Sequence, residues 1–254
     1  MSSTQETFIS HLIELRERVI RALLAFAVIF IALFLYPGSG AIYDFLAAPL
    51  MRALPEGAKM IATGVITPFM VPVKVTAMVA LMVALPYVLY QAWAFVAPGL
   101  YEHEKRLALP VVVASTVLFL TGVAFCYYFV FGRVFTFINH FAPKSITPAP
   151  DIEAYFNFVI TMFIAFGVTF EIPIVVMLLV RFGVVSVDKL KDARPYVIVG
   201  AFIVAAVITP PDVLSQLMLA IPMCLLYEAG LLFGRFVGKR ADHAKSPTEM
   251  AEEK

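Results

Sequence analysis

The feature that most constrains this chain is a series of apolar runs, several of them longer than the roughly 18 residues needed to cross a bilayer. The first extends from Val19 to Tyr36, and three others cover about residues 68–97, 107–131 and 154–182. Hydrophobic residues make up 61% of the sequence and charged residues 15%, whereas soluble domains have about half and a quarter. A water-soluble fold could not bury that much apolar surface, so we predict that lipid surrounds most of the chain.

Two further apolar runs, residues 196–208 and 213–236, flank the turn sequence Thr209-Pro210-Pro211-Asp212. We therefore predict an all-α polytopic membrane protein with six transmembrane helices in one domain, residues 1–240, and a disordered polar tail at residues 241–254. The fifth and sixth helices are expected to be short. With a rise of about 1.5 Å per residue the fifth reaches about 20 Å, against a hydrocarbon core of about 30 Å, so the hairpin is expected to thin the bilayer.

The segments between the runs contain loop signals but no inserted soluble domain. Residues 37–67 form a predicted loop with room for a short interfacial helix at about residues 41–54. Pro72 and Pro86 lie inside the second run, where each removes a backbone donor and is expected to kink the helix. The N-terminal lead is too acidic, and its apolar run too long, for a cleaved signal peptide. We therefore predict that the first helix is retained.

Lysine and arginine are concentrated at one end of the predicted helices. With six crossings, fourteen of the 19 Lys and Arg residues fall on one side of the membrane. Because cytoplasmic loops carry the excess of positive charge, both termini are predicted to face the cytoplasm. The fourteen are Arg16, Arg18, Arg21, Lys105, Arg106, Arg181, Lys189, Lys191, Arg194, Arg235, Lys239, Arg240, Lys245 and Lys254.

The sequence lacks the residues that several classes of function require. Cys126 and Cys224 lie inside apolar runs, where a thiol behaves as a small buried hydrophobe. The sequence has no Cys and His cluster with metal-ligand spacing, no glycine-rich phosphate loop and no GxSxG motif, so we predict no metal or cofactor. The net charge of +1 includes no basic block suited to nucleic acid. All 4 histidines lie outside the apolar runs, which leaves an intramembrane enzyme without a nucleophile–base pair.

Some charged residues of the N-terminal segment have partners at helical spacing and one does not. If the segment is helical, Glu14 pairs with Arg18, and Glu17 pairs with Arg21, each four residues apart. Arg16 has only apolar neighbours at that spacing, so it needs a partner from elsewhere. A phospholipid headgroup is one alternative.

Glu104 repeats this situation in the predicted second cytoplasmic turn, because Glu102 reaches Arg106 and leaves Glu104 without a helical partner. A carboxylate in the first turn of a helix is also favoured by the macrodipole, which is the alternative explanation. We interpret Glu104 as an anion available to a partner molecule. Glu228 is expected to pair with Arg235 or to lie at the interface.

Glu171 lies in the middle of an apolar run. An ionised carboxylate at that depth costs at least about 2.5–3.5 kcal/mol, so we expect it to be protonated, to face a wet cavity or to meet a partner. Pro173 frees a carbonyl one turn earlier, which suits a cavity-lining position. The same residue supports an alternative function, a proton-coupled transporter of a small solute, for which Lys74 alone is a poor complement.

The turn Thr209-Pro210-Pro211-Asp212 fits a capping box, in which the prolines stand where no backbone donor is needed and Asp212 reaches back. Ser215 and Gln216 follow one turn later and are expected to line the same polar end. This part of the hairpin is predicted to lie on the periplasmic side.

Four separated segments together resemble the TatC family, the receptor subunit of the twin-arginine protein translocation system. The resemblance covers nearly all of residues 8–238. Its most specific segments are Phe8-Ile9-Ser10-His11-Leu12-Ile13-Glu14-Leu15-Arg16, Tyr90-Gln91-Ala92-Trp93-Ala94-Phe95-Val96-Ala97-Pro98-Gly99-Leu100-Tyr101 with Glu104, Phe166-Gly167-Val168-Thr169-Phe170-Glu171, and Arg194-Pro195-Tyr196 through Thr209-Pro210-Pro211-Asp212.

The resemblance implies a receptor for the twin-arginine signal peptides of folded cargo proteins. It assigns Glu14 and Glu104 to the signal-peptide site, and implies that Arg16, Pro49 and Phe95 also belong to it, so that changes at these three residues disturb transport. It further implies a concave, glove-like six-helix bundle with Glu171 in its hollow. The implied partners are the single-span proteins TatA and TatB and further copies of the chain, and the implied energy source is the proton-motive force in the cell inner membrane.

Overall fold

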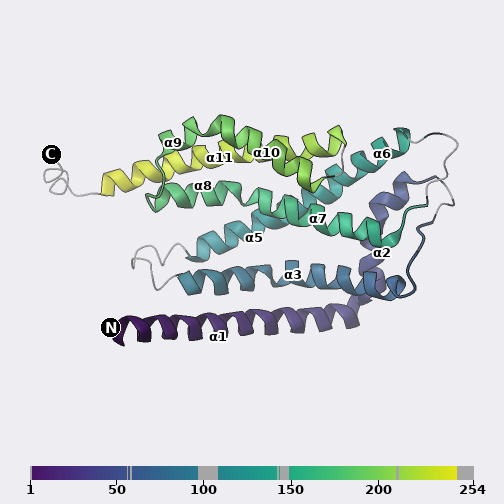
Figure 1. Ribbon diagram of the computed structural model, residues 1–254, viewed down its shortest axis with the longest axis horizontal. Helices are drawn as coiled ribbons and strands as arrows, with labels where there is room; N and C mark the ends of the chain where they lie inside the picture. Colours follow the sequence, from purple (N-terminus) through teal and green to yellow (C-terminus); the bar gives the residue numbers. More distant parts are fainter. Residues whose placement is uncertain are drawn as a thin grey trace. The chain divides into compact units, whose positions relative to one another are not determined.

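The structure is a computed structural model, which describes residues 2–55, 57, 59–96, 108–141, 143, 149–209 and 212–244 (Figure 1). Regular structure in these ranges is helical, and an isolated bridge between Ile61 and Asp151 is the one β pairing among them. The predicted all-α class is therefore confirmed for the described residues. The elements are α1 Ser2–Leu33, the kink η1 Phe34–Gly38, α2 Ser39–Ala53, α3 Thr67–Val96, α5 Ala108–Phe125, the π-helical η3 Cys126–Val130, α6 Phe131–Phe141, α7 Ile152–Phe170, α8 Ile172–Arg181, α9 Val187–Asp192, α10 Arg194–Ile208 and α11 Val213–Ala244.

Five helical stretches are long and apolar enough to cross a membrane, and α10 is a shorter apolar helix. The short fifth helix is thus confirmed, since α10 has 15 residues and extends about 22 Å. The prediction of a short sixth helix is wrong, because α11 has 32 residues and runs on into the polar segment. The long stretches are His11–Ala53, Thr67–Phe95, Ala108–Phe141, Ile152–Arg181 and Val213–Arg235.

The first long helix begins well before the apolar run, at Ser2, because the amphipathic lead and the run form one continuous helix. It ends where Tyr36 adopts an extended backbone and Gly38 has φ +94°, a value that side chains with a Cβ rarely tolerate. The chain then turns into α2, which confirms the short helix predicted in this loop.

Two predicted helix ends differ from the structure. The third helix continues past residue 131 through η3 and α6 to Phe141, because Phe131, Val134 and Phe135 recur on one face and are buried. The fourth span is divided at Glu171 into α7 and α8. Pro173 supplies no amide hydrogen to the helix there, so the ladder of hydrogen bonds restarts.

The chain divides into two compact units, Met1–Leu120 with Ile138–Ile160, and Thr121–Phe137 with Thr161–Lys254. In the first unit α1 and α2 both pack on α3. The buried Tyr155 hydroxyl donates to the Leu46 carbonyl of α2 at 2.8 Å, and Asn139 Nδ2 donates to the Ala53 carbonyl at 2.9 Å. Side chains from α6 and α7 therefore hold α2 at two points.

A polar contact joins the loop before α3 to the start of α7 in the same unit. The Ile61 amide donates to the Pro150 carbonyl at 3.0 Å, and the hydroxyl of Thr63 donates to Asp151 at 2.8 Å. Hydrogen bonds from the Ala154 amide and then the Thr63 hydroxyl hold the pKa of Asp151 below its usual range. This carboxylate thereby fixes the loop and caps the helix at once.

Lys74 also contacts the start of α7. Its Nζ lies 3.0 Å from Glu153 Oε1. The ion pair is about half exposed, with 43% and 45% of the two side chains accessible. Its contribution to stability is therefore small, at most about 1 kcal/mol.

The second unit is built around the packing of α11 against α8. Val176, Leu190, Tyr227 and Leu231 form its buried cluster, and the Tyr227 hydroxyl donates to the Leu190 carbonyl at 2.7 Å. Gly230 lies directly against α8, so close that an added Cβ would collide with it. The absence of a side chain at this position is what allows the two helices to approach.

Candidate functional site

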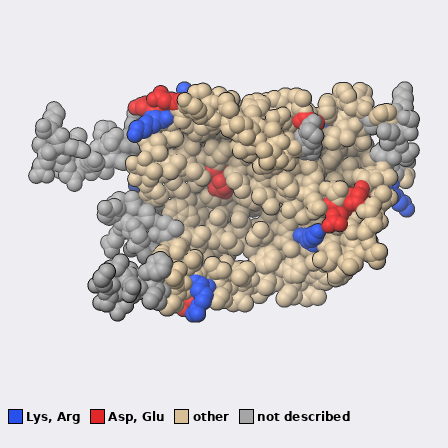
Figure 2. All heavy atoms as spheres, viewed as in Figure 1, with Lys and Arg blue, Asp and Glu red and all other residues tan. Residues whose placement is uncertain are grey.

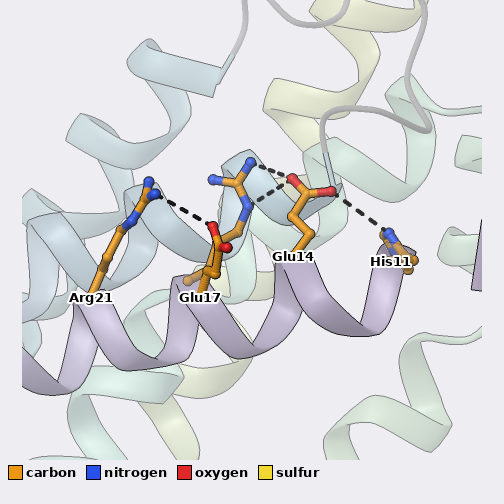
Figure 3. A network of polar contacts seen from close by, with 5 residues as sticks. His11, Glu14, Glu17 and Arg21 are labelled. Carbon is orange, nitrogen blue, oxygen red and sulfur yellow. Dashed lines mark hydrogen bonds and ion pairs between the residues drawn. The ribbon is translucent and has the colours of Figure 1, made fainter. Parts of the chain in front are cut away.

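Charged side chains are sparse on the visible face of the protein, where they form small groups in a largely uncharged surface (Figure 2). One such group lies on α1 (Figure 3). Arg18 Nε donates to Glu14 Oε1 at 2.9 Å, and Arg18 Nη2 donates to the same oxygen. Arg21 lies 3.6 Å from Glu17. Both predicted ion pairs are therefore confirmed.

The two oxygens of the Glu14 carboxylate have different surroundings. Arg18 donates two hydrogen bonds to Oε1, whereas Oε2 lies 4.0 Å from His11 Nδ1, beyond hydrogen-bonding distance. No described amide, and no side chain among those described from His11 onward, donates to Oε2, and the Glu14 side chain is 33% exposed. A ligand could therefore reach Oε2 while Arg18 stays bound to Oε1.

Phe95, on the last turn of α3, reaches this site through His11. The two rings stack with centroids 4.2 Å apart and planes inclined by 22°. Sequence reasoning gave His11 no role. Its spacing of three residues from Glu14 was a readable signal, but the contact with α3 was not, because it depends on how two helices pack.

Arg16 and Glu104 do not join the described contact. Arg16 is exposed and lies two residues from Glu14, which places it roughly 200° around the helix. It has no ion pair with any side chain that the structure describes, in keeping with the sequence analysis. Glu104 lies outside the described residues.

Pro49 lies in α2, and this helix follows the end of α1 opposite the N-terminus (Figure 1). The length of α1 between Glu14 and Leu33 is roughly 28 Å. The signal-peptide role that the resemblance implies for Pro49 stays a prediction. Its ring removes an amide donor from α2, which is a local effect on that helix.

Glu171 belongs to the second unit and is half-buried at the junction of α7 and α8. Its amide donates to the Val168 carbonyl at 3.0 Å, and its own carbonyl accepts from the Val175 amide at 3.0 Å. The backbone thus makes one tight turn at Glu171, between the end of α7 and the start of α8. A cavity-lining role for the side chain stays a prediction.

The α10–α11 hairpin is polar as predicted, but the capping box is wrong in detail. Asp212 itself precedes α11, and its Oδ1 accepts from the Ser215 amide at 2.7 Å. The Thr209 hydroxyl instead donates to the Ala205 carbonyl at 2.8 Å, closing α10. Gln216 Nε2 donates to the Phe202 carbonyl at 3.3 Å and so ties the two helices together.

Glu228 pairs with Arg194, and not with Arg235, which was one of the two alternatives that the sequence offered. Arg194 Nη2 donates to Glu228 Oε2 at 2.7 Å, and Arg194 Nε lies 2.7 Å from Oε1. The pair joins the first turn of α10 to α11. Within the described ranges no group of three His, Cys, Asp or Glu side chains is placed to hold a metal ion.

These features define a multi-pass, all-helical membrane protein with a half-open carboxylate on its first long helix. The family described as Sec-independent protein translocase protein (TatC) matches residues 10–222. Similar proteins include TatC of Haemophilus influenzae, 49% identical over 96% of this chain and 95% of the relative. TatC of Escherichia coli (strain K12) is 48% identical over 92% of this chain and 90% of the relative.

The chain therefore belongs to the TatC family of Sec-independent protein translocases, which confirms the resemblance drawn from the sequence. A crystal structure of a twin-arginine translocase receptor, TatC, is similar throughout, with a TM-score of 0.76 and 35% identity. It covers 89% of this chain and 99% of its own. The protein is accordingly a translocase subunit and transport receptor, and not an enzyme.

Proposed function

We propose that this chain binds the twin-arginine signal peptides of folded cargo proteins at the cytoplasmic face of the inner membrane, and that Glu14 is one of the binding carboxylates. The observation that carries the proposal is the open Oε2 of Glu14, beside a first oxygen already neutralised by Arg18. The similar receptor structure supports the class of ligand.

Arginine suits this site better than lysine does. A guanidinium is planar and offers several N–H donors in a fixed fork, whereas an ammonium is a compact, strongly hydrated point charge. One arginine of the cargo pair binds Glu14 Oε2, and the other binds Glu104, which the family resemblance assigns to the same site. Arg16, on the other side of α1, is a further residue of the signal-peptide site, with a phospholipid headgroup as the alternative partner.

The rest of the translocation scheme follows from the charge distribution and from the family. Both termini face the cytoplasm, because most lysines and arginines fall on that side. The apolar part of the signal peptide enters the hollow of a concave bundle beside Glu171. TatA, TatB and further copies of the chain then assemble around it, and the proton-motive force drives transport without a nucleotide or other cofactor.

Site-specific photocrosslinking tests the proposed site, with a paired-arginine signal peptide and its lysine–lysine version. We expect Glu14→Gln and Glu104→Ala to lose crosslinks to the arginine peptide while both proteins still insert. Glu17→Gln is the matched control, because Glu17 lies on the same helix and pairs with Arg21. Undiminished crosslinking in both site variants would refute the assignment, as would labelling that places residues 101–106 outside the cell.

A further inference from the structure

We infer that His11, backed by Phe95, forms a stacking surface for an arginine of the signal peptide and contributes to the selection of arginine over lysine. This inference rests on the proposed function. It adds a contact with the flat face of the guanidinium to the contact that Glu14 makes with its edge.

The first step of the argument is the state of the His11 ring. Phe95 stacks on it at 4.2 Å, which holds the imidazole in one orientation. The His11 side chain is nevertheless 49% exposed. A flat aromatic ring is therefore fixed from one side and accessible from outside.

The second step is the distance from this ring to the open carboxylate oxygen. His11 Nδ1 lies 4.0 Å from Glu14 Oε2. A guanidinium that stacks on the ring therefore has an acceptor for its N–H groups within reach. A cation within about 6 Å of a ring centroid is attracted to it, and arginine also stacks by its plane.

The third step is the position of Arg18. It donates twice to Glu14 Oε1, on the oxygen that does not face His11. The internal arginine therefore neither covers the stacking surface nor takes the open oxygen. Lysine in place of the incoming arginine would bind the oxygen but would have no plane to place against the ring.

The affinities of paired-arginine and paired-lysine peptides for the full chain in lipid nanodiscs test the inference, measured by fluorescence anisotropy. For His11→Ala we expect the affinity for the arginine peptide to fall about 3- to 30-fold, with the lysine peptide changed by less than about 2-fold. His11→Phe keeps the flat ring and should restore most of the arginine affinity. His11→Leu keeps apolar bulk without an aromatic face and should behave as His11→Ala does.

Equal losses for the two peptides in His11→Ala would overturn the inference, because they indicate general damage to the site. Retention of the arginine preference in His11→Ala, or failure of His11→Phe to restore it, would overturn it as well. These outcomes leave the proposed function standing. A wild-type protein that binds neither peptide, or both equally, would instead contradict the proposed function itself.

Discussion

Replacing Gly230 by alanine tests the close packing of α11 against α8. A Cβ at this position would lie 2.9 Å from the Val176 Cβ and 3.0 Å from the Pro173 Cα. Carbon atoms in contact prefer about 3.5–4.0 Å, so the helices must separate by roughly 0.5–1 Å. The contact with Pro173 involves backbone and cannot be relieved by rotating a side chain. Such overpacking costs about 1–3 kcal/mol.

Gly200→Ala supplies the matched control. Gly200 lies within α10 with no atom within 4 Å of its added Cβ, so the change gains helix propensity without a collision. That gain, up to about 1 kcal/mol, is shared by Gly230→Ala and cancels between the two variants. The free energies of unfolding should then differ by about 1–3 kcal/mol. For a chain of this size the melting temperatures should differ by roughly 2–12 °C.

Thermal unfolding in detergent can be followed with a thiol-reactive dye. Cys126 is fully buried and Cys224 is partly buried, and both lie in the unit that contains Gly230. Gly234→Ala should fall between the other variants, because its nearest contact, 3.2 Å away, is a methyl group of Val180. A melting temperature for Gly230→Ala equal to or above that of Gly200→Ala would refute the packing argument.

Three further perturbations test the contacts within each unit. Tyr155→Phe removes a buried hydrogen bond to α2 and should lower the free energy of unfolding by about 0.5–1.5 kcal/mol; an unchanged melting temperature would contradict this. Asp151→Ala should speed hydrogen exchange at the amide of Thr63, which donates to the carboxylate. Because the pKa of Asp151 is lowered in the folded protein, the wild-type contact should persist above about pH 4 and weaken only as the pH falls through the lowered value. Glu228→Gln should lower the free energy of unfolding by at most about 1 kcal/mol, because the pair with Arg194 is nearly half exposed. A coupling energy above that value in a double-mutant cycle with Arg194→Met would contradict this.

Local patterns in the sequence predicted the helices and the pairs within them. Glu14 and Arg18 lie four residues apart, so helix geometry alone determined their contact. The extents of the apolar runs likewise predicted α3 to within one residue at each end. These successes concern residues that are near one another in the chain.

Contacts between distant residues were not readable in this way. Arg235 was one of the two alternatives for Glu228 because of its proximity in the sequence, but α10 brings Arg194 to Glu228. The stacking of His11 on Phe95 depends on the packing of α1 against α3. The third helix was predicted to end too early for a different reason. Polar residues interrupt the apolar run in α6, although the buried face of the helix continues through them.

The ion pair between Arg18 and Glu14 has a consequence for the rate at which a ligand binds. The Glu14 charge is balanced by Arg18, and the Glu17 charge is balanced by Arg21, so these two carboxylates of α1 exert little attraction beyond a few ångströms. Cations should not accumulate at α1, and Glu14→Gln should change the ionic-strength dependence of the association rate only weakly. Discrimination between cargo proteins would then occur after arrival, through how long each one stays.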